Sequence, residues 1–273
     1  MGFIDFTAGD NPTAAQFDEM FRQTTMVFAD ASARDTALSG VLAEGMVAYL
    51  ADSDRVTVYD GTGWVVAAGA APMHAVVKYS TSGTFTKADF PWAKSAKITV
   101  TGGGGGGQGN ADAFNDRGGG SGAAGGTAIA VVALSAMAAS ETVTVGAGGA
   151  GSVGNATASA GGTSSFGALA VATGGAGGRT NNFTTGGAGT VGDLLLAGGG
   201  GAPGGGTATA PGGQGAASIW GGGGGGAPIL FANSNGFAGS APGSGGGGGF
   251  RNTANVTGGP GAPGLVVVEL GPA

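Results

Sequence analysis

The sequence predicts a mainly β protein with two regions of different composition. Glycine occurs 66 times in 273 residues and charged residues make up 10% of the chain, whereas ordinary soluble domains contain about 7% glycine and about 25% charged residues. Only 8 of the glycines precede residue 98, while 18 of the charged residues lie there. Beyond residue 97, short β-branched runs alternate with glycine runs, a pattern typical of short strands separated by tightly packed or looping segments.

Residues 1–70 are predicted to form a small α+β module. Asn11 and Pro12 are typical of a helix start. Apolar residues then recur at spacings of three and four, which predicts an amphipathic helix. This stripe consists of Phe17, Met20, Phe21, Thr24 and Phe28. Three strand-like segments follow, separated by turns, and predict a meander. They are 46–50, 56–59 and 64–66.

Residues 97–273 are predicted to form a glycine-rich, β-sandwich-like domain, joined to the module by a connector with a first strand at 71–96. We expect the first and last apolar runs, 97–101 and 265–270, to share one sheet, because this closes the domain and satisfies backbone groups at its edges. The expected strands are 97–101, 127–132, 142–145, 165–173, 193–197 and 265–270.

Three arrangements of the glycine runs can be compared. A collagen triple helix is disfavoured because glycine does not recur strictly every third residue. A flexible linker is disfavoured because apolar runs, Trp220 and six phenylalanines interrupt the glycine. We therefore expect an ordered domain in which the runs cross a β-scaffold or stack as polyproline-II- or polyglycine-II-like segments, which the absence of a Cβ permits. The longest runs are 102–107, 198–201, 221–226 and 245–249.

Composition argues against several classes of partner. The chain has no cysteine, a net charge of −6 and a pI of about 4.5, so neither a thiolate metal site nor a basic nucleic-acid-binding face is expected. No apolar run reaches the roughly 18 residues of a membrane span, and the first residues lack the features of a signal peptide. We expect no cofactor, no metal, no nucleic-acid partner and no membrane insertion.

Catalytic motifs are also scarce, so the chain is predicted not to be an enzyme. No glycine run is followed by the lysine of a phosphate-binding loop, and no Gly-x-Ser-x-Gly elbow occurs. His74 is the only histidine, next to a proline-containing segment. Asp112 and Asp116 have the residue types of a glycosidase pair, but both lie in one polar stretch, where turn formation or calcium-like solvation explains them.

Four polar–aromatic clusters interrupt the glycine, at 108–117, 179–184, 231–237 and 250–255. Arginine, aromatic and amide side chains recognise carbohydrate and protein surfaces through flat apolar faces and directional hydrogen bonds. The other interpretation is that asparagine serves turns and phenylalanine fills a small core. The candidate receptor-binding residues are Asn110, Phe114, Arg117, Arg179, Asn182, Phe183, Phe231, Asn233, Phe237, Phe250, Arg251 and Asn252.

Three stretches resemble the glycine-rich domain of phage tail fibres. They are the opening at 77–86 with 96–104, the centre at 142–149 with 161–167, and the end at 258–269. The resemblance covers about residues 77–271. Segments 33–38, 44–50 and 58–64 resemble the N-terminal parts of minor tail proteins of phages that infect actinobacteria. The chain shows no long shaft repeat between the two regions, which favours a short spike or tip adhesin.

The resemblance implies a virion protein of the tail that forms a homotrimer, contacts other tail or baseplate proteins through its N-terminus and binds a bacterial cell-envelope glycan or surface protein. We expect the four clusters to lie together at the end distal to the N-terminus. A second function of another class stays open, namely a structural virion protein without a receptor, such as a head fibre or capsid decoration protein. A third, a virion-borne glycan hydrolase, depends only on Asp112 and Asp116.

Overall fold

The computed structural model describes residues 26–53, 55–67, 74–110, 118–179, 182–205, 210–229, 233–251 and 255–272. It is mainly β, as predicted, and the chain divides into two compact units, 1–73 and 74–273. The second unit begins before the glycine-rich region. Its strands β5 (Ala75–Tyr79) and β6 (Gly83–Thr86) lie in the stretch that the sequence assigned to a connector.

The N-terminal unit contains a four-stranded sheet in the order β1-β2-β3-β4. Strand β1 is Met26–Phe28, β2 is Val47–Leu50, β3 is Arg55–Tyr59 and β4 is Trp64–Val66. The antiparallel meander of β2, β3 and β4 confirms the prediction. The helical prediction is wrong for Phe28, because this residue pairs with Leu50 in a parallel strand. The rest of the apolar stripe lies outside the described residues.

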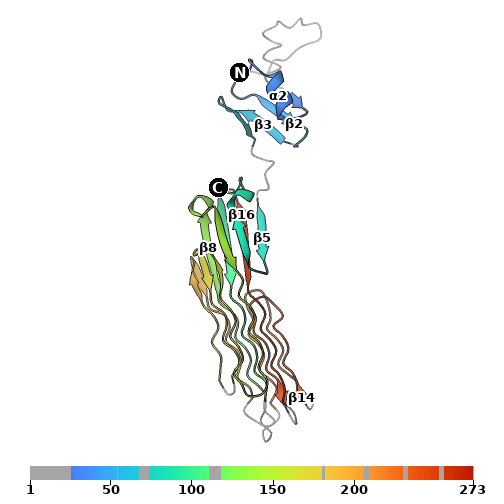
Figure 1. Cartoon of the computed structure of the whole chain (residues 1–273), viewed down its shortest axis with the longest axis vertical. Helices are drawn as coiled ribbons and strands as arrows, with labels where there is room; N and C mark the ends of the chain where they lie inside the picture. Colours follow the sequence, from blue (N-terminus) through green and yellow to red (C-terminus); the bar gives the residue numbers. More distant parts are fainter. Residues whose placement is uncertain are drawn as a thin grey trace, which may run out of the picture. The chain divides into compact units, whose positions relative to one another are not determined.

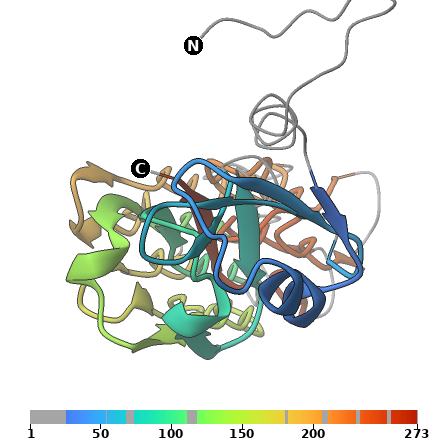
Figure 2. The same cartoon turned by 90° about the horizontal axis from the view of Figure 1, so that it is seen from above.

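Helix α2 (Ala31–Ala37) lies beside β1 and β2 (Figures 1 and 2). It begins after Asp30, whose carboxylate accepts a hydrogen bond from the Ala33 amide at 2.8 Å and so caps the first turn. Arg34 fastens the helix to the sheet. Its buried guanidinium lies 4.4 Å from the Trp64 ring centroid and donates to the Thr57 hydroxyl at 3.2 Å.

The second unit contains a sandwich of two five-stranded sheets, ordered β13-β8-β7-β16-β5 and β12-β11-β10-β9-β6. The pairing of β7 with β16 confirms that the first and last apolar runs share a sheet. The remaining strands are β7 (Ser95–Thr101), β8 (Thr127–Ala133), β9 (Ser140–Thr144), β10 (Ser164–Phe166), β11 (Ala170–Ala172), β12 (Gly189–Val191), β13 (Leu194–Leu196) and β16 (Leu265–Gly271).

The core of the sandwich lies between its sheets. Along β7, Ala96, Ile98 and Val100 are buried, as the period of two in a strand requires. The ring of Phe166 packs 5.5 Å from that of Phe85. The single strand expected at 165–173 is instead the hairpin β10–β11, which turns at Gly167 with φ of +50°. Short 3₁₀ turns η1 (Lys87–Asp89) and η2 (Leu134–Ala136) lie at one end of the sandwich.

Beyond the sandwich, the glycine-rich segments run side by side as an elongated bundle (Figure 1). The backbone of segment 102–109, which continues strand β7, donates hydrogen bonds with a period of three. Gly102, Gly105 and Gln108 donate to segment 118–126 at 2.7–3.0 Å. Gly103 and Gly106 donate to a second neighbour, and Gly104 and Gly107 to a third. Three residues per turn is the period of polyglycine II, so the stacked arrangement of extended segments is confirmed.

Segment 102–109 is surrounded by six neighbours, because each turn also accepts hydrogen bonds from three further segments. Gly175, Gly149 and Gly246 donate to the carbonyl groups of Gly103, Gly104 and Gly105. Adjacent neighbours are hydrogen-bonded to one another, which closes the ring. In order around the centre they are 118–126, 173–178, 158–162, 146–152, 258–262 and 243–249. Every described residue of 102–110, 118–128 and 243–251 is buried.

Steric contact explains the glycine in these segments. A Cβ added at Gly104 would overlap the carbonyl oxygen of Ser244, and one at Gly106 would overlap that of Ala150. The same holds around the bundle, where the obstacle is almost always backbone that has no room to move. Glycine is therefore required by close backbone approach in the interior of the bundle.

Candidate surface-recognition site

The four polar–aromatic clusters gather at the end of the bundle opposite the end at which the chain enters the second unit. Strand β7 starts beside the C-terminal end of β16 and runs into segment 102–109, which ends at Asn110. There Asn110 pairs with Val256, and Gly118 pairs with Phe250. Strand β14 (Asn233–Ser234) pairs with β15 (Phe250–Arg251) at the same end (Figure 1). The backbone of Arg179 packs directly against Gly120, because a Cβ on that glycine would overlap the Arg179 carbonyl. Arg179 therefore also lies near this end.

Clusters 108–117 and 250–255 contribute buried side chains where they are described. Asn110 is 3% exposed, Phe250 4% and Arg251 8%, so these three candidates do not offer exposed side-chain surface. Their burial follows from their place on interior segments of the bundle. The Nε and Nη1 atoms of Arg251 make no hydrogen bond to the described part of the chain.

Cluster 179–184 is exposed at most of its described residues. Arg179 and Asn182 pair with each other, both are exposed, and the Phe183 ring is 81% exposed. The next residue anchors the cluster, because the Thr184 hydroxyl donates to the Ser121 carbonyl at 3.1 Å. A shallow pocket of about 180 Å³ lies here. It is lined by Ala176, Arg179, Asn182, Phe183, Thr184 and Thr185.

Cluster 231–237 lies on the other side of the central segment. Asn233 is exposed in β14. Asn235 fixes the backbone there, since its carboxamide oxygen accepts from the Thr257 amide at 2.9 Å. The Phe237 ring is 59% exposed and lies along the flank of the bundle. The exposed candidates therefore form two groups. Candidates Phe114, Arg117, Phe231 and Asn252 lie outside the described residues.

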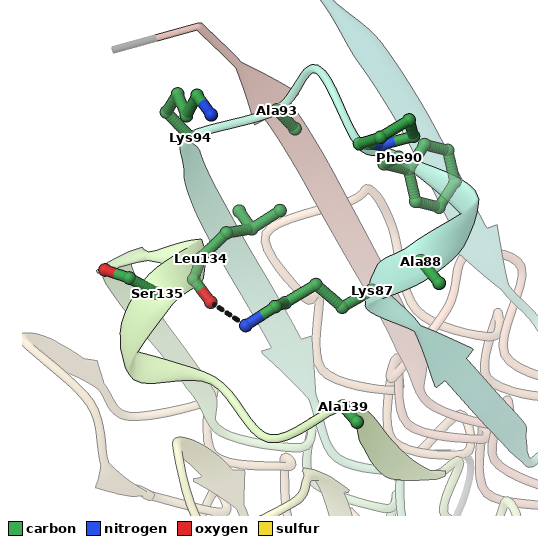
Figure 3. Close-up of a pocket in the computed structure, with 9 residues that line it drawn as sticks. Lys87, Ala88, Phe90, Ala93, Lys94, Leu134, Ser135 and Ala139 are labelled. Carbon is green, nitrogen blue, oxygen red and sulfur yellow. Dashed lines mark hydrogen bonds between the residues drawn. The ribbon is translucent and has the colours of Figure 1, made fainter.

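A larger, mostly apolar pocket of about 600 Å³ lies at the opposite end of the second unit, beside η1 and η2 (Figure 3). Phe90, Leu134 and the stems of Lys87 and Lys94 line it. The Lys87 ammonium donates to the carbonyl groups of Leu134 at 2.9 Å and Met137 at 3.3 Å. This lysine joins the two 3₁₀ turns. The sequence analysis did not single out the pocket, because its lining comes from short, ordinary segments far apart in the chain.

The described carboxylates beyond residue 97 have structural partners. Asp193 accepts from the Val131 amide at 2.7 Å, Glu141 accepts from the Ala138 amide at 3.2 Å, and Glu269 pairs with Lys97 at 2.8 Å. No group of three potential metal ligands occurs among the residues that the structure describes. Within that same part of the chain, no helix is both long and apolar enough to span a membrane.

Comparison with known families adds one result. The profile of a family described as a glycine-rich domain matches residues 80–271, a span that contains the bundle and every strand of the sandwich except β5. The chain belongs to this glycine-rich domain family. A search of curated proteins finds no match.

Proposed function

We propose that this protein is a bacteriophage tail adhesin, in which the glycine-rich domain presents recognition loops at the end of a rigid bundle. One observation carries the proposal. Close backbone contact excludes a Cβ at the glycines of the interior segments, and the exposed side chains of Arg179, Asn182 and Phe183 lie at the end of the bundle opposite the chain's entry. A scaffold of this kind separates fold from specificity, as loop-borne binding sites do. The assignment to a bacteriophage tail depends on the resemblance to phage tail fibres.

Arg179, Asn182 and Phe183 are the main residues of the proposed receptor site. Phe183 offers an exposed flat ring, and Arg179 and Asn182 offer directional donors around one shallow pocket. This combination suits a sugar ring or a protein loop. The N-terminal unit, in this proposal, attaches the protein to the tail. No chemistry on the receptor is proposed.

The experiment compares adsorption of phage particles that carry wild-type protein with particles that carry the double variant Arg179→Ala/Phe183→Ala. We expect slower adsorption to host cells, because each contact of this kind contributes about 1–2 kcal/mol and several copies act together. The matched control is Thr157→Ala with Pro260→Ala, which removes exposed side chains elsewhere on the bundle. Equal adsorption of the folded, incorporated double variant would contradict this assignment of the receptor site.

A structural role without a receptor is the second candidate. The burial of Asn110, Phe250 and Arg251 favours it, because these cluster residues serve the fold. The two functions differ in position and copy number. An adhesin is expected at the distal end of the tail in few copies, whereas a decoration protein is expected in many copies on the capsid. Immunogold labelling of intact particles distinguishes them.

A further inference from the structure

Peripheral segments of the bundle keep their outward-facing positions for residues other than glycine. On segment 146–152, Ala147 and Ala150 are exposed, whereas a Cβ at Gly148, Gly149 or Gly151 would overlap a neighbouring backbone. The outward residues recur every third position, as the polyglycine II turn requires. Exposed residues of this kind on other peripheral segments are Thr157, Ala160, Pro211, Gln214, Pro260 and Pro263.

The glycine run 221–226 breaks this pattern. Gly222 and Gly225 occupy its outward positions, and a Cβ there would meet nothing closer than 3.8 Å and 3.4 Å, respectively. Apart from Gly154, whose φ is +60°, every other described glycine between 102 and 264 would meet an atom at 3.2 Å or less. Nothing among the described residues of one copy therefore requires glycine at these two positions.

The run has the composition of the central segment but only part of its surroundings. Each of Gly103 to Gly107 both donates and accepts a backbone hydrogen bond. Among residues 222–226, only the Gly224 amide donates a backbone hydrogen bond. The other four amides donate to no carbonyl group of the described residues. The neighbours of the run are 212–216, 236–240 and 243–248, which fill half of the six positions around a polyglycine II segment. No described segment occupies the remaining positions, and Gly222 is exposed while Gly223, Gly225 and Gly226 are half-buried.

The face around the run suits another uncharged chain. Residues 194–250 contain no Asp, Glu, Lys, Arg or His, although the whole chain carries a net charge of −6. Because all the charged residues lie outside 194–250, two copies would meet no charge repulsion within this stretch, whereas their net negative charge elsewhere would repel. Exposed apolar side chains flank the run, namely Ile219 at 51%, Trp220 at 38%, Ile229 at 45% and Phe237 at 59%. An exposed apolar patch of this kind is typical of an interaction surface.

We propose that the run 221–226 is a self-association surface, on which a second copy of this chain lays its own run and fills positions that are empty around the first. The carbonyl groups of Gly222, Gly224 and Gly225 accept hydrogen bonds within the copy, whereas those of Gly223 and Gly226 accept none from the described residues. Two such runs are self-complementary, because each offers these two carbonyl groups together with four amides that donate to no described residue. Glycine at 222 and 225 then acquires the steric reason that it has in the interior, namely close approach of a foreign backbone. A partner with side chains facing the run would not require it. The inference does not depend on the receptor assignment.

The experiment uses the full chain and the double variant Gly222→Gln/Gly225→Gln. Its matched control is Ala147→Gln/Ala150→Gln, which adds the same side chain at outward positions of another peripheral segment. Sedimentation velocity is measured across a 100-fold range of protein concentration. We expect wild type and control to associate, and the glycine double variant to stay monomeric throughout. Amide exchange at Gly103–107 is measured in the same samples and should stay slow in all three proteins, which shows that the bundle is intact.

Two results would overturn the proposal. One is a wild-type protein that stays monomeric at every concentration, which would mean that the run does not bind a second copy. The other is a double variant that associates as wild type does while its bundle is intact. If the double variant loses protection at Gly103–107, the smaller change Gly222→Ala replaces it, because a single Cβ fits the isolated chain at this position. Undiminished association of that variant would then also count against the proposal.

Discussion

Several chain segments run from the sandwich straight into the bundle, and the two regions differ in what fills the space between the segments. Strand β7 pairs with β8 and β16, and its extension 102–109 keeps the extensions of those strands, 118–126 and 258–262, as neighbours. In the sandwich, Ile98 and Val100 fill the layer between two sheets, which lie about 10 Å apart in such folds. In the bundle that layer is absent, and backbone contacts backbone on all sides. The period of the chain changes from two to three at this boundary.

The largest effect should come from adding side chains to the bundle interior. Valine at Gly247 or Gly223 would overlap the carbonyl of Gly225 or Gly215, and in both cases the obstacle is backbone rather than the end of a flexible side chain. We expect Gly247→Val and Gly223→Val each to destabilise the second unit by more than about 3 kcal/mol, measured by denaturant unfolding. Gly222→Ala is the control, because its Cβ meets open space. Unchanged unfolding midpoints for both valine variants would mean that the runs are loose loops.

The sandwich should respond to the opposite change, removal of a side chain. Phe166 is fully buried against Phe85, so Phe166→Ala should cost about 3–5 kcal/mol through lost burial and a cavity. The same measurement on Val131→Ala, at a residue that is 62% exposed, should change stability by less than about 0.5 kcal/mol. Similar losses for the two variants would show that the sheets do not enclose this core.

In the N-terminal unit, the expected effect is smaller and depends on one cation. Arg34→Met keeps an apolar stem but removes the stacking on Trp64 and the hydrogen bond to Thr57. We expect a loss of about 1–3 kcal/mol, seen by calorimetry as a lower transition temperature for this unit alone. Arg55→Met, at an exposed position, provides the comparison. A shift for Arg55→Met as large as that for Arg34→Met would remove the special role of Arg34.

The smallest effect concerns the turn after β3. Hydrogen bonds from the backbone amides of Thr62 and Gly63, with the Thr62 hydroxyl, lower the pKa of the Asp60 carboxyl below its ordinary value. Because the folded pKa lies below the unfolded one, the contribution to stability is present above the unfolded pKa of about 3.9 and is lost as pH falls through the folded pKa. Carbon NMR should give a titration midpoint below 3.9, and a midpoint at or above that value would contradict the hydrogen-bonded turn.

Much of the fold could be predicted from the sequence, because short runs of β-branched residues favour strands wherever they occur. Strands β7, β8, β9, β13 and β16 lie where the apolar runs indicated. The hairpin at 164–172 was missed, since Gly167 turns the chain inside what reads as one continuous run. Phe28 fits the helical spacing only by coincidence. Its pairing with Leu50 in a strand is a contact between residues far apart in the sequence, which local periodicity cannot predict.

The candidate site was predicted in part. The gathering of the clusters at one end follows from segments of similar length leaving one sandwich. Exposure could not be read in the same way, because it depends on which segments have six neighbours. Asn110 and Phe250 lie on such interior segments, whereas Phe183 lies on a peripheral segment.

Residue-resolved amide exchange by NMR tests the bundle most directly, because the number of neighbours sets which amides are hydrogen-bonded. The account predicts unbroken protection from Gly103 to Gly107, where every amide donates to another segment. On the peripheral segment 146–152, it predicts protection at Gly149 and Ser152 and fast exchange at Ala147 and Ala150. Protection at every second residue of that segment, or fast exchange throughout Gly103 to Gly107, would contradict a polyglycine II bundle.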